Sequence, residues 1–538
     1  MQGRKRKPEP GLFLYGDPYQ KLPQEPFWRE LEAQLGDLEW VREATRELYA
    51  PVLGRPSLDP VVFLKAMLAG YFQNLVTDSE LAFRMADSLT LRRFLGYGLE
   101  EETPDRTTLL KTRQRWPVEL FAQIFLRVLE QLAEVGLVKG THLSTDTVLI
   151  DANASMDSLR HRAFGCDYRS YVKALYSQGG EVPTPGEVSR KDAQRPHKGS
   201  NQEWVSGTDA EAAVAVHPDG HTALSYRVDG TMDTETGALV QIGVAPGDVR
   251  DSEDLAQRAA EAQANAEGLG LEVETLTADR GHHSEENLVE VAELGIEPIL
   301  RERGQRGEPG FRPRDFLYVP EQDVYQCPAG EALHRVGAGE PGSGGRYQLS
   351  GKVCRACPHF GVCTKSKAGR GLTRAEHEAE LEANRARVQS VEGALLLGRH
   401  RQRAEGPWSY AKLYGGFARL GTRGLANAWK QAFVQAIGWN LMLLVAHLTG
   451  RTPRGWSERK GRLGTGRSGE LGAAGALRGA MAAAAAFGGA VVAGLGALSA
   501  LLSYLVALCL SIRTHRSSSR SCRWGRGRSR RWALSQGC

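Results

Sequence analysis

The 538-residue sequence predicts a mixed α/β (α+β) protein that begins with an all-helical region and ends in an apolar, arginine-rich tail. Apolar residues recur at helical spacing through residues 24–138. Residues 141–304 instead contain several strand-like segments and then alternate between helix and strand, an order typical of one mixed sheet. The expected divisions are a helical region (1–140), a sheet region (141–304), a cysteine-rich insertion (305–372), C-terminal helices (373–450) and the tail (451–538).

Helices in the N-terminal region are expected at 27–35, 59–75, 78–87, 89–95 and 107–135. The expected capping residues are Asp59 (with Pro60 after it), Asp78, Ser88 and Thr107. The start of the last helix gathers four basic residues, Arg106, Lys111, Arg113 and Arg115. Such a helix can contact phosphates or lie in a major groove. The alternative is a solvated basic face on a helical bundle.

The sheet region has expected strands at 143–150, 212–217, 222–233, 238–245, 273–277 and 298–301, and expected helices at 252–267 and 284–294. Asp146 lies near the middle of the first strand, and Asp279 follows a strand directly before a helix, where α/β folds place their sites. If these two strands are neighbours, the two aspartates meet. Asp151 is the alternative to Asp146 if the strand register is misassigned. Residues 170–205, rich in Gly, Pro, Ser and charge, predict a mobile insertion.

A third carboxylate, Glu405, has Arg401 four residues before it and Lys412 seven residues after it. In one helix these three side chains share a face. Pro407 interrupts the pattern, so Arg401 can lie off this face while Glu405 and Lys412 share it. Taken alone, such a glutamate is most often a salt-bridged surface residue.

Four segments in this order resemble bacterial insertion-sequence transposases of the DDE type. They are Pro104–Arg113, Asp146 with Ala152–Ser155, Ala278–His282 before a helix containing Glu286–Leu288, and the Arg401, Glu405 and Lys412 set. The resemblance covers roughly residues 50–448, and it departs from the family at Gly398, where a tyrosine is usual. It implies a helical DNA-binding domain followed by an RNase H-like catalytic domain.

The resemblance also implies the chemistry. Asp146, Asp279 and Glu405 would hold two Mg²⁺ or Mn²⁺ ions for phosphodiester cleavage and strand transfer, assisted by Arg401 and Lys412. The implied partners are double-stranded DNA at transposon ends, target DNA and further copies of the chain. The residues expected to contact DNA are Arg106, Lys111, Arg113, Arg115, Lys412, Arg419 and Arg423. The alternatives are an inactive, transposase-derived DNA-binding protein and a protein that acts at a membrane through its tail.

Four cysteines, Cys327, Cys354, Cys357 and Cys363, form a second candidate site. A Cys-x2-Cys pair with two further thiols nearby is suited to a structural Zn²⁺ ion. Reduced thiols or a redox pair are the alternative, and His334 and His359 are less favoured substitutes as ligands.

Charge separates the tail from the rest of the chain. The net charge is +5, but residues 451–538 carry fifteen Lys and Arg against two Glu, which leaves the preceding 450 residues at −8. DNA binding by that part must therefore come from local basic patches. Residues 479–512 contain no charged residue, which predicts either a membrane anchor or an unrelated extension. The absence of a visible signal peptide predicts a cytoplasmic protein.

Overall fold

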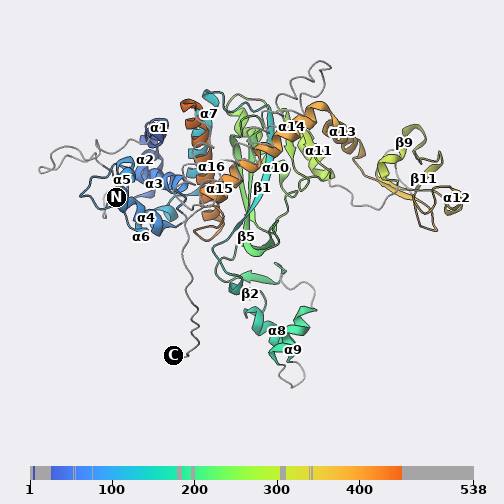
Figure 1. Cartoon of the computed structure of the whole chain (residues 1–538), viewed down its shortest axis with the longest axis horizontal. Helices are drawn as coiled ribbons and strands as arrows, with labels where there is room; N and C mark the ends of the chain where they lie inside the picture. The colour runs from blue at the N-terminus through green and yellow to red at the C-terminus, as the bar shows by residue number, and fades with distance from the viewer. Residues whose placement is uncertain are drawn as a thin grey trace, which may run out of the picture. The chain divides into compact units, whose positions relative to one another are not determined.

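The computed structural model describes residues 4–5, 26–51, 54, 56–75, 77–177, 184–194, 200–302, 311–337, 340 and 343–450 (Figure 1). The chain divides into two compact units, Met1–Gly455 and Trp456–Cys538, and every described residue belongs to the first unit. Both expectations for the tail, the membrane anchor and the unrelated extension, fall outside the described residues.

Helices make up the described N-terminal region, as predicted. They are α1 (Pro26–Leu35), α2 (Glu39–Thr45), α3 (Pro60–Gln73), α4 (Asp78–Asp87), α5 (Leu89–Leu95), α6 (Arg106–Arg115) and α7 (Val118–Glu134). Asp59 and Ser88 cap α3 and α5 as expected. The other two cap predictions are wrong, because the acceptor that precedes each first turn is Thr77 for α4 and Asp105 for α6.

The single helix expected over 107–135 is also wrong. Helix α6 ends at Arg115 and α7 begins at Val118. Pro117 explains the break, because it lacks an N–H and forces the preceding Trp116 into an extended conformation (φ −72°, ψ 126°). Trp116 is fully buried, with its ring 4.9 Å from that of Phe63.

The mixed sheet predicted for the second region is present. Its strands are β1 (His142–Asp151), β4 (Ala213–Val216), β5 (Thr222–Asp233), β6 (Leu239–Pro246), β7 (Thr275–Ala278) and β8 (Glu297–Leu300). Their order is β4-β5-β1-β7-β8, and β6 also pairs with β5. Strand β1 is antiparallel to β5 and parallel to β7, so it joins the antiparallel and parallel halves. Helices α10 (Leu255–Glu267) and α11 (Glu285–Glu293) connect the last strands.

Helix α16 (Leu425–Thr449) links the sheet to the N-terminal helices, because it packs against β6, α7 and α3. Asn440 accepts from the Leu239 N–H (2.9 Å) and donates to the Leu239 carbonyl (2.8 Å). Among the described residues α16 is the one helix long and apolar enough to cross a membrane. Its most apolar window is 72% buried within the protein, as expected for the central helix of a packed core.

The insertion after β1 contains more regular structure than predicted. Helices α8 (Tyr168–Tyr176) and α9 (Pro185–Ala193) lie beyond a two-stranded ladder of β2 (Leu159–His161) and β3 (Trp204–Ser206). The prediction of a mobile insertion over 170–205 overlooked two N-terminal caps, Asp167 and Thr184, which define these helices.

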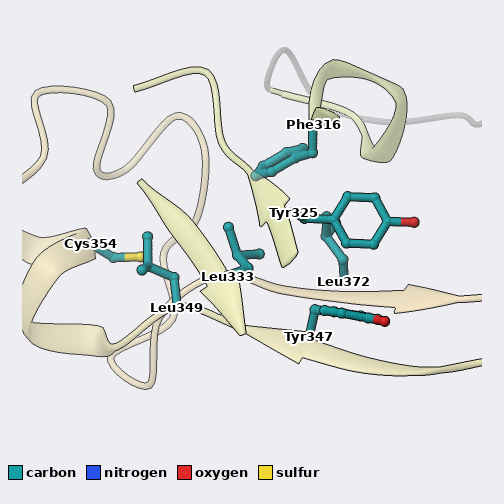
Figure 2. Packing of buried hydrophobic residues seen from close by; sticks show 7 residues of the cluster. All are labelled: Phe316, Tyr325, Leu333, Tyr347, Leu349, Cys354 and Leu372. Carbon is teal, nitrogen blue, oxygen red and sulfur yellow. The ribbon is translucent and has the colours of Figure 1, made fainter. Parts of the chain in front are cut away.

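The cysteine-rich region forms its own antiparallel sheet in the order β13-β12-β11-β10-β9. The elements are β9 (Leu317–Val319), β10 (Val324–Gln326), β11 (Ala332–Val336), β12 (Gly345–Gln348), α12 (Gly351–Ala356) and β13 (Gly371–Arg374). Its buried core consists of Phe316, Tyr325, Leu333, Tyr347, Leu349, Cys354 and Leu372 (Figure 2). An apolar core therefore stabilises this region, whether or not its cysteines bind a metal ion.

Three helices follow the cysteine-rich sheet and lead back to the main core. They are α13 (Glu378–Gln389), α14 (Val391–Arg403) and α15 (Glu405–Tyr414). Helix α14 contacts β7, and α15 contacts α3 and α16. The first of these contacts places α14 beside β7, the strand that precedes Asp279.

Candidate active site

Asp146 lies on β1, and Asp279 directly follows β7, the parallel neighbour of β1. Thr145 of β1 is paired with Ala278, the last residue of β7, and each aspartate is the next residue along the chain. Burial raises the pKa of Asp146 to about 6; a backbone hydrogen bond at Thr147 opposes this shift, and the negative charge of Asp279 adds to it. The sheet therefore brings together two of the three predicted carboxylates.

A tight turn after β7 fixes the Asp279 carboxylate. Its Oδ1 accepts from the Gly281 N–H at 2.9 Å and lies 2.7 Å from Nδ1 of His282. Burial acts to raise the pKa of Asp279, but the hydrogen bond and charge of the buried His282 bring the net pKa below its usual value. Asn287 of α11 holds His282 in turn, because its Nδ2 donates to the His282 carbonyl at 2.7 Å. His282 is thus a positioning residue that sequence reasoning missed.

Asp251 is a further acid at this end of the sheet, and sequence reasoning missed it as well. Thr147 Oγ1 donates to Asp251 Oδ1 at 2.8 Å, and the negative charge of Asp251 also raises the pKa of Asp146. A Cβ on Gly281 would lie 2.8 Å from Asp251 Oδ2 and 3.1 Å from Asp279 Oδ1, so both carboxylates border this glycine. Asp251 lies in the irregular segment before α10, where neither periodicity nor spacing marks it.

Glu405 is the first residue of α15 and is exposed. Among the described residues its carboxylate belongs to no group of three or more ligand side chains with mutually close ligand atoms. Residues near it in the chain nevertheless approach Asp279 and the strand partner of Asp146. His400 of α14 lies within electrostatic range of Asp279, and Trp408 of α15 packs against Gly230, the residue paired with Asp146 on β5.

The cations predicted to flank Glu405 are placed differently from each other. Arg401 is exposed in the last turn of α14, whereas Lys412 shares α15 with Glu405. The two helices separate at Ala404 because Pro407 has no N–H to bond to the Arg403 carbonyl. Burial lowers the pKa of the half-buried Lys412, and the acids that oppose this shift are Asp151 and Asp219.

Asp151, the alternative to Asp146, lies apart from Asp279. It is the last residue of β1, and its carboxylate contacts His217 (3.2 Å) and His221 (3.3 Å). The strand pairing therefore favours Asp146 as the partner of Asp279.

One residue predicted to contact DNA is structural. Arg113 is buried, pairs with Asp78 at 2.5 Å, and its carbonyl accepts from Lys430 Nζ at 2.9 Å. This position faces the interior of the helical region, and a contact of Arg113 with DNA stays a prediction. The other arginines and the lysine outside α15 are exposed, namely Arg106, Lys111, Arg115, Arg419 and Arg423.

The four cysteines lie near one another without a shared ligand geometry. Burial raises the pKa of the Cys363 thiol, and Cys354, Cys327 and Cys357 add to the shift. Among the described residues, however, the one group of three or more ligand side chains with mutually close ligand atoms is Asp151, His217 and His221. Zinc at the cysteines stays a prediction.

Comparison with protein families gives two matches. Residues 17–115 match the family described as Transposase domain (DUF772), and residues 326–445 match the family described as Transposase DDE domain. The chain carries a transposase DDE domain. It is therefore an enzyme of phosphoryl transfer, and the matched range of this transposase includes Glu405.

Among solved structures, the transposase is similar to a piggyBac transposase synaptic complex with hairpin DNA, determined by cryo-electron microscopy. The identity is 8%, the TM-score is 0.29, and the match covers 82% of this chain and 80% of that one. No curated protein matches the sequence.

The carboxylates of this transposase suit the divalent ions that DDE domains typically use. Asp146, Asp251 and Asp279 offer the hard oxygen donors that Mg²⁺ and Mn²⁺ prefer. Asp251 and Asp279 both raise the pKa of Asp146, and a cation bound among them would relieve that repulsion. The donor chemistry of this set suits such an ion, but its oxygen atoms do not form a group as close as that of Asp151, His217 and His221.

Proposed function

We propose that this transposase cleaves and joins the ends of an insertion sequence, with Asp146, Asp279 and Glu405 as its catalytic acids. The observation that carries the proposal is the pairing of Thr145 with Ala278, which sets Asp146 beside Asp279 in a chain with a transposase DDE domain. The strand order β6-β5-β1-β7-β8, antiparallel and then parallel, supports an RNase H-like catalytic domain.

Each residue has a distinct part in the reaction. Asp146 and Asp279 would hold the ions, and His282 keeps the Asp279 carboxylate in one orientation. Bound Mg²⁺ or Mn²⁺ supplies activation of a water or a 3′ hydroxyl and stabilisation of the leaving oxygen. Glu405 is exposed at the start of α15, where its carboxylate can complete the ligand set.

The proposed partners are the element ends, target DNA and further copies of the chain, in the cytoplasm. Arg106 and Lys111 present charge from α6, and Arg419 and Arg423 present it between α15 and α16. Exposed cations of this kind bind phosphates and make affinity dependent on salt. Lys412 and Arg401 remain proposed as auxiliary groups at the reacting phosphate.

The experiment measures cleavage of labelled duplexes that carry the sequences bordering the gene, with Mg²⁺ and with chelator. Asp146→Ala, Asp279→Ala and Glu405→Ala are each expected to lower the cleavage rate at least about a hundredfold while DNA binding persists. Glu392→Ala, an exposed glutamate of α14, is the matched control and should cleave normally. Normal cleavage by any of the three variants would remove that residue from the site. Binding without cleavage by the unmodified chain would instead favour an inactive descendant.

A further inference from the structure

A second group of ligand side chains lies at the C-terminal end of β1, where Asp151 is the last residue of the strand. His217 and His221 flank the turn between β4 and β5, where the His217 N–H donates to the His221 carbonyl at 2.8 Å. Gly220 has φ +90°, which allows the short turn. The two imidazole rings stack with centroids 4.0 Å apart and face Asp151 together.

The three ligand atoms lie within 4.8 Å of one another, close enough to hold one metal ion. His217 Nε2 and His221 Nε2 lie 3.2 and 3.3 Å from the same Asp151 Oδ1 atom. Tetrahedral Zn²⁺ with bonds of about 2.0–2.1 Å to nitrogen and oxygen separates its ligands by about 3.3 Å. The three atoms therefore need little rearrangement to share an ion.

Neighbouring residues orient this group as the partners of metal ligands do. Asp219 Oδ1 lies 2.7 Å from Nδ1 of His221, which leaves Nε2 directed at Asp151. His217 is buried, and its Nε2 also lies 2.9 Å from Ser225 Oγ, a hydrogen bond that an ion would replace. Lys412 of α15 lies within electrostatic range of Asp151 and Asp219.

We propose that Asp151, His217 and His221 bind a divalent transition-metal ion of the Zn²⁺ class, separately from the catalytic acids. Two imidazoles and one carboxylate favour such ions over Mg²⁺, which prefers all-oxygen ligands. Water would fill the fourth position.

The ion would hold together segments that are distant in sequence. Asp151 already bonds through its backbone to Ala418 (3.3 Å) and Leu420 (2.8 Å), which follow α15. A metal ion at Asp151 therefore fixes the hairpin of β4 and β5 to the end of β1, next to the segment that carries Arg419. Its role is to order the chain between Glu405 and α16.

The test measures Zn²⁺ binding to the full chain by calorimetry in excess Mg²⁺, which occupies the oxygen sites. Asp151→Asn and His221→Gln should each lose one equivalent of Zn²⁺, or weaken its binding about tenfold to a hundredfold. The matched control is His447→Gln, an exposed histidine of α16, which should bind as the unmodified chain does. His221 is half-exposed, so its replacement leaves the fold intact, as circular dichroism will verify.

Co²⁺ absorption separates this site from the cysteines. Thiolate ligands give sulfur-to-metal charge-transfer bands, whereas imidazole and carboxylate ligands give only weaker ligand-field bands. The two variants should lose ligand-field intensity and keep any charge-transfer bands. Unchanged Zn²⁺ stoichiometry and affinity in both variants would overturn the proposal, as would binding only at millimolar Zn²⁺.

Discussion

Trp408 lies directly over Gly230, in the space that a side chain at position 230 would fill. A Cβ there would stand 2.5 Å from Cζ2 of the Trp408 ring. Because Gly230 is paired with Asp146, side chains at these two positions project from the same face of the sheet. The glycine thus lets α15, the helix that begins with Glu405, approach the face that carries Asp146.

Gly230→Ala is expected to push Trp408 and α15 away from the sheet. The indole ring is rigid and buried, and Leu239 closes the other side with an atom 2.9 Å from the added Cβ. We expect a loss of stability of about 1–3 kcal/mol and a larger relative loss of cleavage, because Glu405 moves with the helix. Thermal unfolding and the cleavage rate below the unfolding midpoint measure the two effects.

Gly398→Ala in α14 is the matched control. A Cβ there meets no atom within 4 Å, and alanine favours the helix by roughly 0.5–1 kcal/mol. Stability should rise slightly with cleavage unchanged. The same stability and the same cleavage rate in Gly230→Ala and Gly398→Ala would show that close packing at Gly230 does not position α15.

Asp251→Asn tests whether Asp251, which no sequence pattern marks, belongs to the metal site. Asparagine can still accept the Thr147 hydrogen bond but removes a negative charge near Asp146. We expect Mn²⁺ affinity and cleavage to fall about tenfold to a hundredfold. The control, Asp248→Asn, changes an exposed acid of the same segment and should alter neither quantity. Unchanged Mn²⁺ binding in Asp251→Asn would exclude this residue.

His400 should make stability dependent on pH. Burial lowers its pKa from 6.5 to about 4, partly offset by Asp279. Below pH 6.5 His400 is therefore protonated in the unfolded chain but stays neutral in the folded chain. The free energy of unfolding falls as the pH drops toward 4. Between pH 7 and pH 5 the loss is about 2 kcal/mol. The stability of His400→Gln should not show this loss between pH 7 and pH 5. An identical dependence of stability on pH in variant and parent would show that His400 is not its source.

The sequence predicted the sheet well because its strands have distinct local patterns. Strand β5 was predicted with its observed bounds, 222–233, and β1 within one residue at each end. The sequence predicted that Asp146 and Asp279 meet on the condition that their strands are neighbours, and the pairing of β1 with β7 fulfils that condition. Predictions failed where one residue outweighs periodicity: Pro117 divides a helix, and Thr77 and Asp105 begin helices one or two residues before the predicted caps.

The rest of the candidate site depends on contacts that no local pattern encodes. Asp251 and His282 join it through Thr147 and Asp279, and His217 and His221 meet Asp151 only after β4, β5 and β1 pair. Arg113 resembles its basic neighbours in sequence. Only the packing of α6 against α4, with Asp78 facing it, reveals an interior residue.

The basic residues of α6 should therefore separate into two classes. Arg106→Ala and Lys111→Ala remove exposed charges, so each should weaken DNA binding and lower the slope of log affinity against log salt by about 1, with stability unchanged. Arg113→Ala leaves Asp78 without its ion-pair partner in a largely buried setting and should destabilise the fold by about 3 kcal/mol. At a temperature where this variant remains folded, its salt slope should equal that of the parent. A reduced slope in folded Arg113→Ala would instead return this arginine to the DNA-binding surface.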